Sequence, residues 1–162
     1  MKVFIADINI IAASPDEYAK LLSPRHCARA LKYVNQRRKL QFILGRLMAK
    51  SSGKKYTSIA ACDDLVVVAA ASNAPVGIDI ANVNMECDAS TINTNMQLPE
   101  PTNHKEVLRN LTFANAAYRA GKWVHCRQFM RHGDYIICVT SVRRFAMPRL
   151  NKFNPDTLLT DK

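Results

Sequence analysis

A carboxylate stands inside an apolar stretch of the sequence, where burial normally excludes a charged group. Asp79 lies in the segment from Pro75 to Ile80, shortly after the apolar run from Leu65 to Ala71. Burying an unpaired carboxylate costs several kcal/mol, so Asp79 must bind a cation, accept several hydrogen bonds, or lie at a strand end that faces a cleft. A turn, or an ion pair with one of the many Arg and Lys residues, is the simplest alternative.

The second feature is an excess of positive charge that is concentrated in one part of the chain. The net charge of the 162 residues is +10, from 23 Lys and Arg against 13 Asp and Glu. No acidic residue occurs from Tyr18 to Cys62. The cations within this stretch are Lys20, Arg25, Arg29, Lys32, Arg37, Arg38, Lys39, Arg46, Lys50, Lys54 and Lys55. Such a field attracts phosphates, acidic proteins or nucleic acid, although a merely solvated helix face would have the same composition.

Composition and length limit the class of protein. A hydrophobic content of 48% in 162 residues is typical of one compact domain or of two small lobes packed together. The chain reaches Asp7 too early for a signal-peptide core, and no apolar run approaches the roughly 20 residues that span a bilayer. The five cysteines form no C-x-x-C pair, which favours free thiols in a reducing compartment. We therefore expect a cytoplasmic protein without a membrane span.

Hydrophobic periodicity predicts an α+β protein with two similar halves. We divide the chain into an N-terminal lobe of residues 1–74 and a C-terminal lobe of residues 75–162, packed as a single compact unit. The expected elements are a strand over 2–10, a helix start at Ser14, a helix from about Arg25 to Lys50, strands over 56–60 and 65–71, the strand with Asp79, a loop over 82–104, a helix over 105–121, a hairpin of strands over 124–130 and 135–142, and a loose basic tail after about residue 143.

Several motifs also occur in the order of one enzyme family. They are Ser23-Pro24 before a basic helix, Arg37 eight residues ahead of Gly45-Arg46-Leu47, Gly53-Lys54 ahead of the strands, and Pro75-Val76-Gly77-Ile78-Asp79-Ile80. In this order the chain resembles the 4′-phosphopantetheinyl transferases of the surfactin-synthetase-activating type. Those enzymes have two related α+β lobes with coenzyme A and a metal between them, and they transfer phosphopantetheine from coenzyme A to a serine of an acyl or peptidyl carrier protein.

The resemblance implies a fold and a set of site residues. The fold would be two-lobed and pseudo-symmetric, each lobe a small antiparallel sheet with a packed helix, with shorter loops than the family after Gly53 and after Asp79. Arg29, Arg37 and Lys54 correspond to cations that hold the phosphates of coenzyme A. Asp79 corresponds to a catalytic acid that binds Mg²⁺, and it is the only family acid that this chain retains. Mg²⁺ prefers such carboxylate oxygens together with substrate phosphates.

The sequence departs from the family at the reacting centre. Ala81 stands where the family has a glutamate after Gly-Ile-Asp-Ile. In the later helix, Ala114 and Asn115 match the lysine and glutamate of the family motif, and Arg119 matches the lysine that follows. Asn115 can offer a carbonyl oxygen to a metal but cannot carry charge or accept a proton at neutral pH. One remaining charged ligand makes a poor magnesium site.

Two interpretations remain within the family resemblance. Glu86, Asp88 or Glu100 of the long loop could replace the missing ligands in a weak transferase, although surface-loop acids are usually only solvated. The balance favours a degenerate homologue that binds a carrier protein or another subunit without turnover. Its partner surface would lie along the helix with Arg29, Lys32 and Arg37, because acyl carrier proteins present acidic helices.

A basic nucleic-acid-binding or structural interaction protein is the alternative from another class. The acid-free stretch, together with Arg143, Arg144, Arg149 and Lys152, could follow a phosphate backbone. No aromatic pair of the kind that stacks nucleic-acid bases stands beside these cations on a predicted strand. Nucleic acid is therefore the less favoured partner.

Overall fold

The computed structural model describes residues 1–11, 13–87, 100–121 and 124–160. Its elements are β1 (Lys2–Asp7), η1 (Ile8–Ile10), α1 (Pro15–Ala19), α2 (Pro24–Ala30), α3 (Gln36–Ser51), β2 (Tyr56–Cys62), β3 (Leu65–Ala71), β4 (Val76–Asn82), α4 (His104–Ala120), β5 (Cys126–His132), β6 (Tyr135–Ser141), β7 (Leu150–Lys152) and α5 (Thr157–Thr160). None of the helices in these described ranges is long and apolar enough to cross a membrane.

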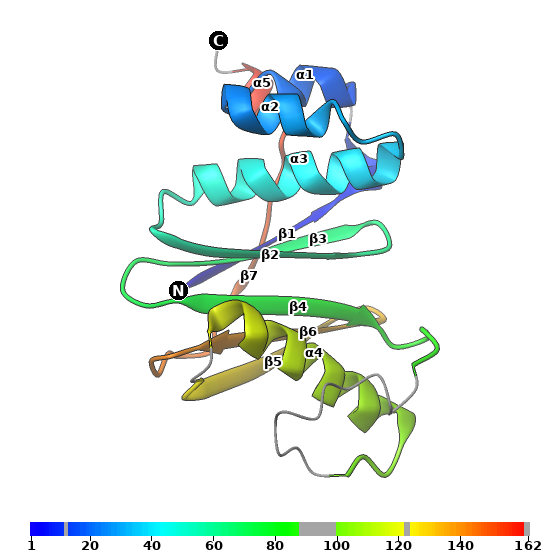
Figure 1. The fold of residues 1–162 in the computed structure, drawn as a ribbon, viewed down its shortest axis with the longest axis vertical. Helices are drawn as coiled ribbons and strands as arrows, with labels where there is room; N and C mark the ends of the chain where they lie inside the picture. The colour runs from blue at the N-terminus through cyan, green and yellow to red at the C-terminus, as the bar shows by residue number, and fades with distance from the viewer. Residues whose placement is uncertain (12, 88–99, 122–123, 161–162) are drawn as a thin grey trace.

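The strands form two small sheets, and the predicted α+β class is confirmed. The first sheet has the strand order β2-β3-β1-β7 and the second has the order β4-β6-β5. All pairs are antiparallel except β1 with β7, which is parallel. The sheets lie between two helical layers, with α1, α2, α3 and α5 on one outer side and α4 on the other (Figure 1).

The two sheets repeat one topology. In each, a strand is followed by a long helix and then by a hairpin whose second strand pairs with the first, which gives β1-β3-β2 and β4-β6-β5. The residue after the first strand donates to the hairpin turn in both units, from Ile8 N to Asp64 O at 2.8 Å and from Val83 N to Asp134 O at 2.7 Å. The chain therefore contains two copies of a βαββ arrangement, as expected of two similar halves.

A shared core joins the copies. Val3 and Ile5 of β1 meet Ile78 and Ile80 of β4 in one buried cluster between the sheets. Every residue of β3 is buried, because this central strand has α3 on one side and the second sheet on the other. Successive residues of β4 point alternately to this core and to α4. The even-numbered residues face the core, and the odd-numbered residues face the helix.

The predicted hairpin over residues 124–142 is present, the two predicted strands over 56–60 and 65–71 form another, and each hairpin turns on two residues. The first turn is Asp63-Asp64 and the second is Gly133-Asp134. The first residue of each turn has a positive φ, 50° at Asp63 and 55° at Gly133. A positive φ at this position matches the twist of short hairpins, and Asp and Gly tolerate it better than other residues.

The single long helix predicted from about Arg25 to Lys50 is wrong. The structure has two helices, α2 and α3, separated by the connection Leu31–Asn35. The side chain of Asn35 accepts a hydrogen bond from Arg38 N at 3.0 Å and begins α3 as its N-cap. Asn competes with helix continuation in this way because its short side chain satisfies free backbone donors at a helix start.

The first strand is also shorter than predicted, because it ends at Asp7 rather than at Ile10. The carboxylate of Asp7 accepts from Asn9 N at 2.8 Å, and the chain turns there into η1. This side-chain bond replaces the backbone pairing that a longer strand would need.

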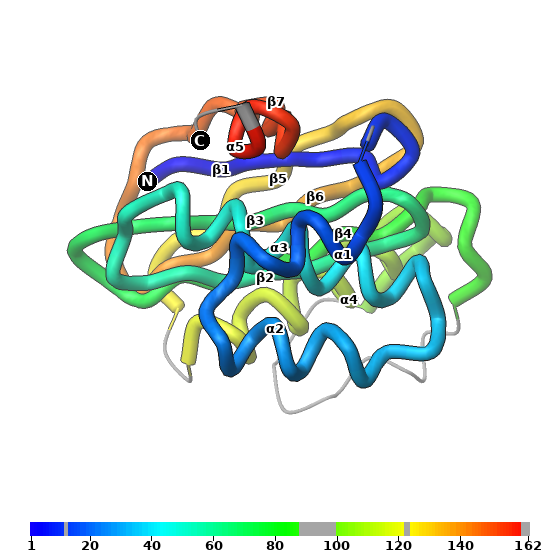
Figure 2. The backbone as a smooth tube through the Cα atoms, turned by 90° about the horizontal axis from the view of Figure 1, so that it is seen from above, coloured from blue at the N-terminus to red at the C-terminus, as the bar shows by residue number. Residues whose placement is uncertain are grey.

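The expectation of a loose tail after residue 143 is wrong as well. β7 pairs in parallel with β1, and Asn151 Nδ2 donates to Val3 O at 3.0 Å. Phe153 N donates to Ile5 O at 2.8 Å, so the segment after β7 stays beside β1 (Figure 2), and α5 then packs in the outer helical layer with α1 and α3. The unpaired edge of β1 explains this arrangement, since exposed strand edges readily add another strand. The C-terminal segment thus returns to the first sheet, although the chain leaves that sheet near residue 74.

Candidate functional site

The carboxylate of Asp79 faces α4 and not the core between the sheets. Its neighbours Ile78 and Ile80 point into that core, whereas Asp79 is 7% exposed beneath the helix. Asn115 Nδ2 donates to Asp79 Oδ2 at 3.1 Å, and Arg119 Nη2 lies 3.2 Å from Asp79 Oδ1. Both donors lie in the C-terminal half of α4, one helical turn apart. The structure therefore brings together the three positions that the family resemblance had aligned with its acids and lysine.

Arg119 also connects the two sheets. Its Nη1 atom donates to Ile59 O of β2 at 2.6 Å and to Ile78 O of β4 at 3.2 Å. β2 and β4 run side by side at this point, and Ile78 N donates to Ser58 Oγ at 3.1 Å. One guanidinium thus satisfies two carbonyls and a carboxylate from both repeats, a use for which its planar set of donors is well suited.

Burial is the main influence on the charge of Asp79. Loss of hydration raises the pKa of the Asp79 carboxyl, and the Asn115 amide, the Arg119 charge and the Ile80 backbone N–H oppose this shift without overcoming it. Ionised Asp79 therefore carries a desolvation cost, and the positive charge of Arg119 offsets part of it. Arg119 itself keeps 38% of its side chain exposed, so the pair is reachable by solvent from the helix side.

The internal repeat shows that the fold does not require an acid at this position. Asp79 lies opposite Cys138, three positions before the strand end Asn82. In the first copy the residue three positions before the strand end Asp7 is Phe4, which packs under α3 with apolar neighbours. The equivalent site thus accepts an aromatic side chain, and the Asp79 cluster is a specific addition to the second copy.

The donor set around Asp79 does not fit a magnesium ion held by the protein alone. Asp79 is its one carboxylate, and the oxygens of that carboxylate already accept from Asn115 and Arg119. Ala81 lies in an apolar cluster beneath α4 and offers no ligand. No group of three His, Cys, Asp or Glu side chains that could hold a metal occurs among the described residues. Mg²⁺ prefers several hard anionic oxygens and is repelled by a guanidinium at the same place.

The predicted substitute acids do not reach this cluster in the described part of the chain. Glu100 lines a hollow with Glu106 and Arg109 beside the first half of α4, whereas Asn115 and Arg119 lie in its second half. Glu86 is exposed after β4. Asp88 lies outside the described residues.

The three predicted coenzyme A cations are not brought together. Arg37 lies at the start of α3, where its Nη2 pairs with Asp64 Oδ1 at 2.7 Å, and Lys54 follows the other end of that helix. A helix of 16 residues is about 24 Å long, so one phosphate cannot contact both. Arg29 lies on α2, with its guanidinium 5.3 Å from the centre of the Phe42 ring.

Phe42 organises a second group that the sequence reading did not find. The guanidinium of Arg46 lies 5.5 Å from the ring centre, and the rings of His26 and Tyr33 lie 6.1 and 5.4 Å away. Burial, and then the nearby Arg charges, lower the pKa of His26.

We call Arg25, His26, Arg29, Lys32, Phe42 and Arg46 the Phe42 cluster. All its members except Phe42 line an open hollow of about 680 Å³ that no acid lines. The spacing of Phe42 and Arg46 on one helix face is the signal that would have indicated it.

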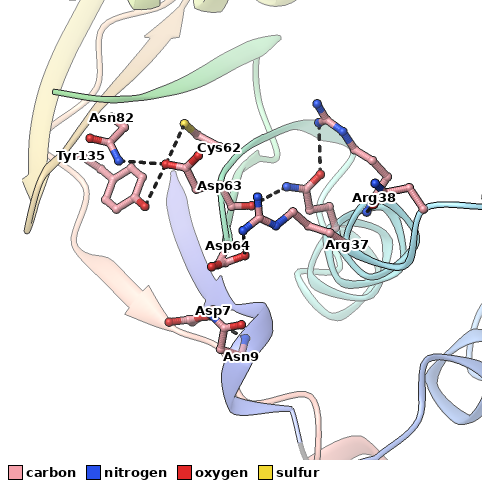
Figure 3. Close-up of polar contacts among 11 residues, drawn as sticks. Asp7, Asn9, Arg37, Arg38, Cys62, Asp63, Asp64, Asn82 and Tyr135 are labelled. Atoms are coloured by element: carbon pink, nitrogen blue, oxygen red, sulfur yellow. Dashed lines mark hydrogen bonds and ion pairs between the residues drawn. The ribbon is translucent and has the colours of Figure 1, made fainter. Parts of the chain in front are cut away.

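A third polar group links the repeats at the turn between β2 and β3 (Figure 3). Asp63 Oδ2 accepts from Asn82 Nδ2 at 2.9 Å and from Tyr135 Oη at 3.2 Å. Asp63 belongs to the first repeat, whereas Asn82 and Tyr135 belong to the second. The pKa of Asp63 is lowered, chiefly by the hydrogen bond that Asn82 donates to its carboxylate. The role of this group is to fix the hairpin tip of one repeat against the strand ends of the other.

Acid should weaken this connection. A carboxyl with a lowered folded-state pKa contributes stability above its unfolded pKa of about 4, and it loses that contribution as the pH falls through the folded-state value. We expect Asp63→Asn to lose less than about 1 kcal/mol near pH 7, since the site is exposed, and to approach the wild type below pH 4. Urea unfolding between pH 3 and 7 measures this. A difference between Asp63→Asn and the wild type that does not change with pH would contradict the assignment.

No protein-family model matches the chain, and no curated protein matches it.

Proposed function

We propose that the chain is a phosphopantetheinyl-transferase-like protein that binds an acyl or peptidyl carrier protein and does not transfer phosphopantetheine. The order of its sequence motifs supports the family resemblance, and so does the repeated βαββ arrangement. The contact between Asn115 and Asp79 adds to this, because the resemblance aligns Asp79 with a metal-binding acid of the family and Asn115 with a glutamate that acts as ligand or base. The pathway would be fatty-acid, polyketide or non-ribosomal peptide synthesis.

The observation that carries the non-catalytic part of the proposal is the occupancy of the Asp79 oxygens. A metal-dependent transfer needs an ion that stabilises charge on the leaving phosphate and a base that takes the serine proton. At this site Arg119 supplies the positive charge from within the chain, and Asn115 cannot act as a base. Arg119 cannot be displaced without freeing Ile59 O and Ile78 O as well. The cluster is suited to holding the fold together and not to turnover.

The basic surface supports the choice of partner. The Phe42 cluster gathers three arginines, one lysine and one histidine around a hollow, and stacking on Phe42 orients two of the guanidinium groups. Preorganised cations bind carboxylates and phosphates more tightly than mobile ones, since less side-chain entropy is lost. An acidic helix of a carrier protein has complementary charge. Coenzyme A is also a polyanion, so it would bind the same cations and compete with the carrier protein.

Mass spectrometry of apo carrier proteins incubated with this protein, coenzyme A and Mg²⁺ tests the proposal. We expect no gain of the phosphopantetheine mass on any carrier, while pull-down at low salt retains a carrier on the wild-type protein. A mass gain that disappears with Asp79→Ala would contradict the non-catalytic role and would show that the protein is a weak transferase. An active transferase of the family serves as the positive control for carrier quality.

A second measurement distinguishes a carrier protein from a nucleic acid as the binding partner. Binding to nucleic acid should fall steeply with salt and be independent of the presence of carrier protein. We expect the carrier to compete with single-stranded RNA for the protein at equal concentration. Binding of RNA with no measurable binding of any carrier would overturn the proposed function in favour of the nucleic-acid class.

A further inference from the structure

Two aliphatic side chains project into solvent from the connection between α2 and α3. Leu31 is 62% exposed and Val34 is 96% exposed. Tyr33 between them turns inward, with its ring centre 5.4 Å from that of Phe42. Of the other large exposed hydrophobic side chains in the described ranges, Met1 and Met147 line one hollow, and Ile10, Met85 and Tyr118 lie in separate segments. Leu31 and Val34 are distinct because they are three residues apart in one short segment.

Hydrogen bonds hold this connection in a defined shape. Lys32 N donates to Arg29 O and Tyr33 N donates to Ala30 O, both at 3.2 Å. At the other end, the Asn35 side chain caps α3. The two aliphatic side chains are therefore displayed on an ordered turn, which lowers the entropy cost of burying them against a partner.

Positive charge borders the same turn. Arg29 and Lys32 line the hollow of the Phe42 cluster and flank Leu31 in sequence, and Arg38 lies in the first turn of α3. Leu31 and Val34 add an apolar contact that phosphate groups alone would not use. The combination suits a partner with an apolar residue surrounded by carboxylates on one helix face.

We infer that the connection Leu31–Asn35 is the docking edge for an acidic amphipathic helix of the carrier protein. Leu31 and Val34 contact apolar side chains of that helix, and Arg29 and Lys32 contact its carboxylates. This inference rests on the proposed function and adds the site and the mode of binding. An anionic membrane is less well matched, because two aliphatic side chains bury little area in a bilayer compared with an amphipathic helix or a lipid chain.

The test compares the affinities of fluorescein-labelled apo acyl and peptidyl carrier proteins for variants of the full chain, by fluorescence anisotropy. We expect Leu31→Ser/Val34→Ser to weaken binding about tenfold or more, because small central sets of buried side chains dominate interface energies. Lys32→Glu should weaken binding and reduce its salt dependence. Ile10→Ser is the matched control, since Ile10 is 63% exposed and lies outside the turn, and it should stay within about twofold of the wild type. Thermal unfolding should show that all variants remain folded, as the replaced side chains are exposed.

The outcomes are distinguishable. If a carrier binds the wild type and the Leu31→Ser/Val34→Ser variant equally, the docking edge is wrong and the proposed function stands. If no carrier binds the wild type, both fail. If the double variant instead loses binding to phosphatidylserine vesicles and keeps its affinity for carrier, the turn is a membrane contact and the inference is overturned.

Discussion

Gly77→Ala should be the most damaging single substitution in the second repeat. A Cβ atom at this position would lie 1.8 Å from the carbonyl oxygen of Ala116 and 2.8 Å from its carbonyl carbon, both in the backbone of α4. A side chain can rotate away from a clash, but the backbone of a helix packed on a strand cannot move without separating the two elements. We expect a loss of about 3 kcal/mol or more in the free energy of unfolding, or failure to fold. Urea unfolding followed by circular dichroism measures it.

Two other glycines provide controls for this expectation. At Gly45 the added Cβ would meet the Cγ2 of Ile59 at 2.5 Å, so this β-branched side chain must shift, but the contact involves no backbone atom and a gain in helix propensity opposes the cost. At Gly53 no atom lies within 4 Å, but φ is +60°, so alanine costs about 1 kcal/mol in backbone strain. Gly45→Ala and Gly53→Ala should therefore remain folded. A Gly77→Ala protein as stable as Gly53→Ala would contradict the close approach of α4 to β4.

Arg119→Ala should produce the second-largest loss, because it removes partners from three groups at once. Asp79 would keep a buried carboxylate with only Asn115 as a side-chain donor, and Ile59 O and Ile78 O would lose their contacts. Breaking a fully buried ion pair costs about 3–5 kcal/mol, and the partial exposure of Arg119 reduces our expectation to about 2 kcal/mol. Arg109→Ala on the same helix removes a guanidinium stacked on Phe129 and should cost less than about 1 kcal/mol.

The pH dependence of this loss identifies its cause. Burial already raises the pKa of Asp79, and removal of Arg119 raises it further. A carboxyl with a raised folded-state pKa favours the folded state below its unfolded pKa and loses that advantage as the pH rises through the folded value. The deficit of Arg119→Ala should thus be largest near pH 7 and smaller near pH 4. Asp79→Asn should recover much of it in the double variant. A deficit that is independent of pH and unchanged by Asp79→Asn would show that the carboxylate is not involved.

The hairpins and α4 could be predicted from sequence because local patterns determine them. Asp63-Asp64 and Gly133-Asp134 provide turn residues, and α4 ends at Gly121 as a capping glycine predicts. The pairing of β7 with β1 could not be predicted, since no local signal links residues nearly 150 positions apart. The break between α2 and α3 was predictable in principle from the Asn35 cap, but the surrounding cations and apolar residues continue a helical pattern across it.

The candidate site was predictable in part. Asp79 is conspicuous because a carboxylate in an apolar strand requires partners, and the aligned positions Asn115 and Arg119 are its partners in the structure. The reach of Arg119 to Ile59 O depends on how the two sheets pack, which sequence periodicity does not determine. The separation of Arg37 from Lys54 follows from the length of α3, and a linear order of motifs gives no indication of it.

The parallel strand β7 has a consequence for how the protein is made. β1 is synthesised long before β7, and its outer edge is paired only after residues 150–152 have been synthesised. During translation the nascent N-terminal sheet therefore carries an open edge, while the second βαββ copy is completed before that edge closes. Contacts so distant along the chain are slow to form, and exposed edges recruit foreign strands. Until residues 150–152 have been synthesised, the outer edge of β1 is therefore open to pairing with a foreign strand.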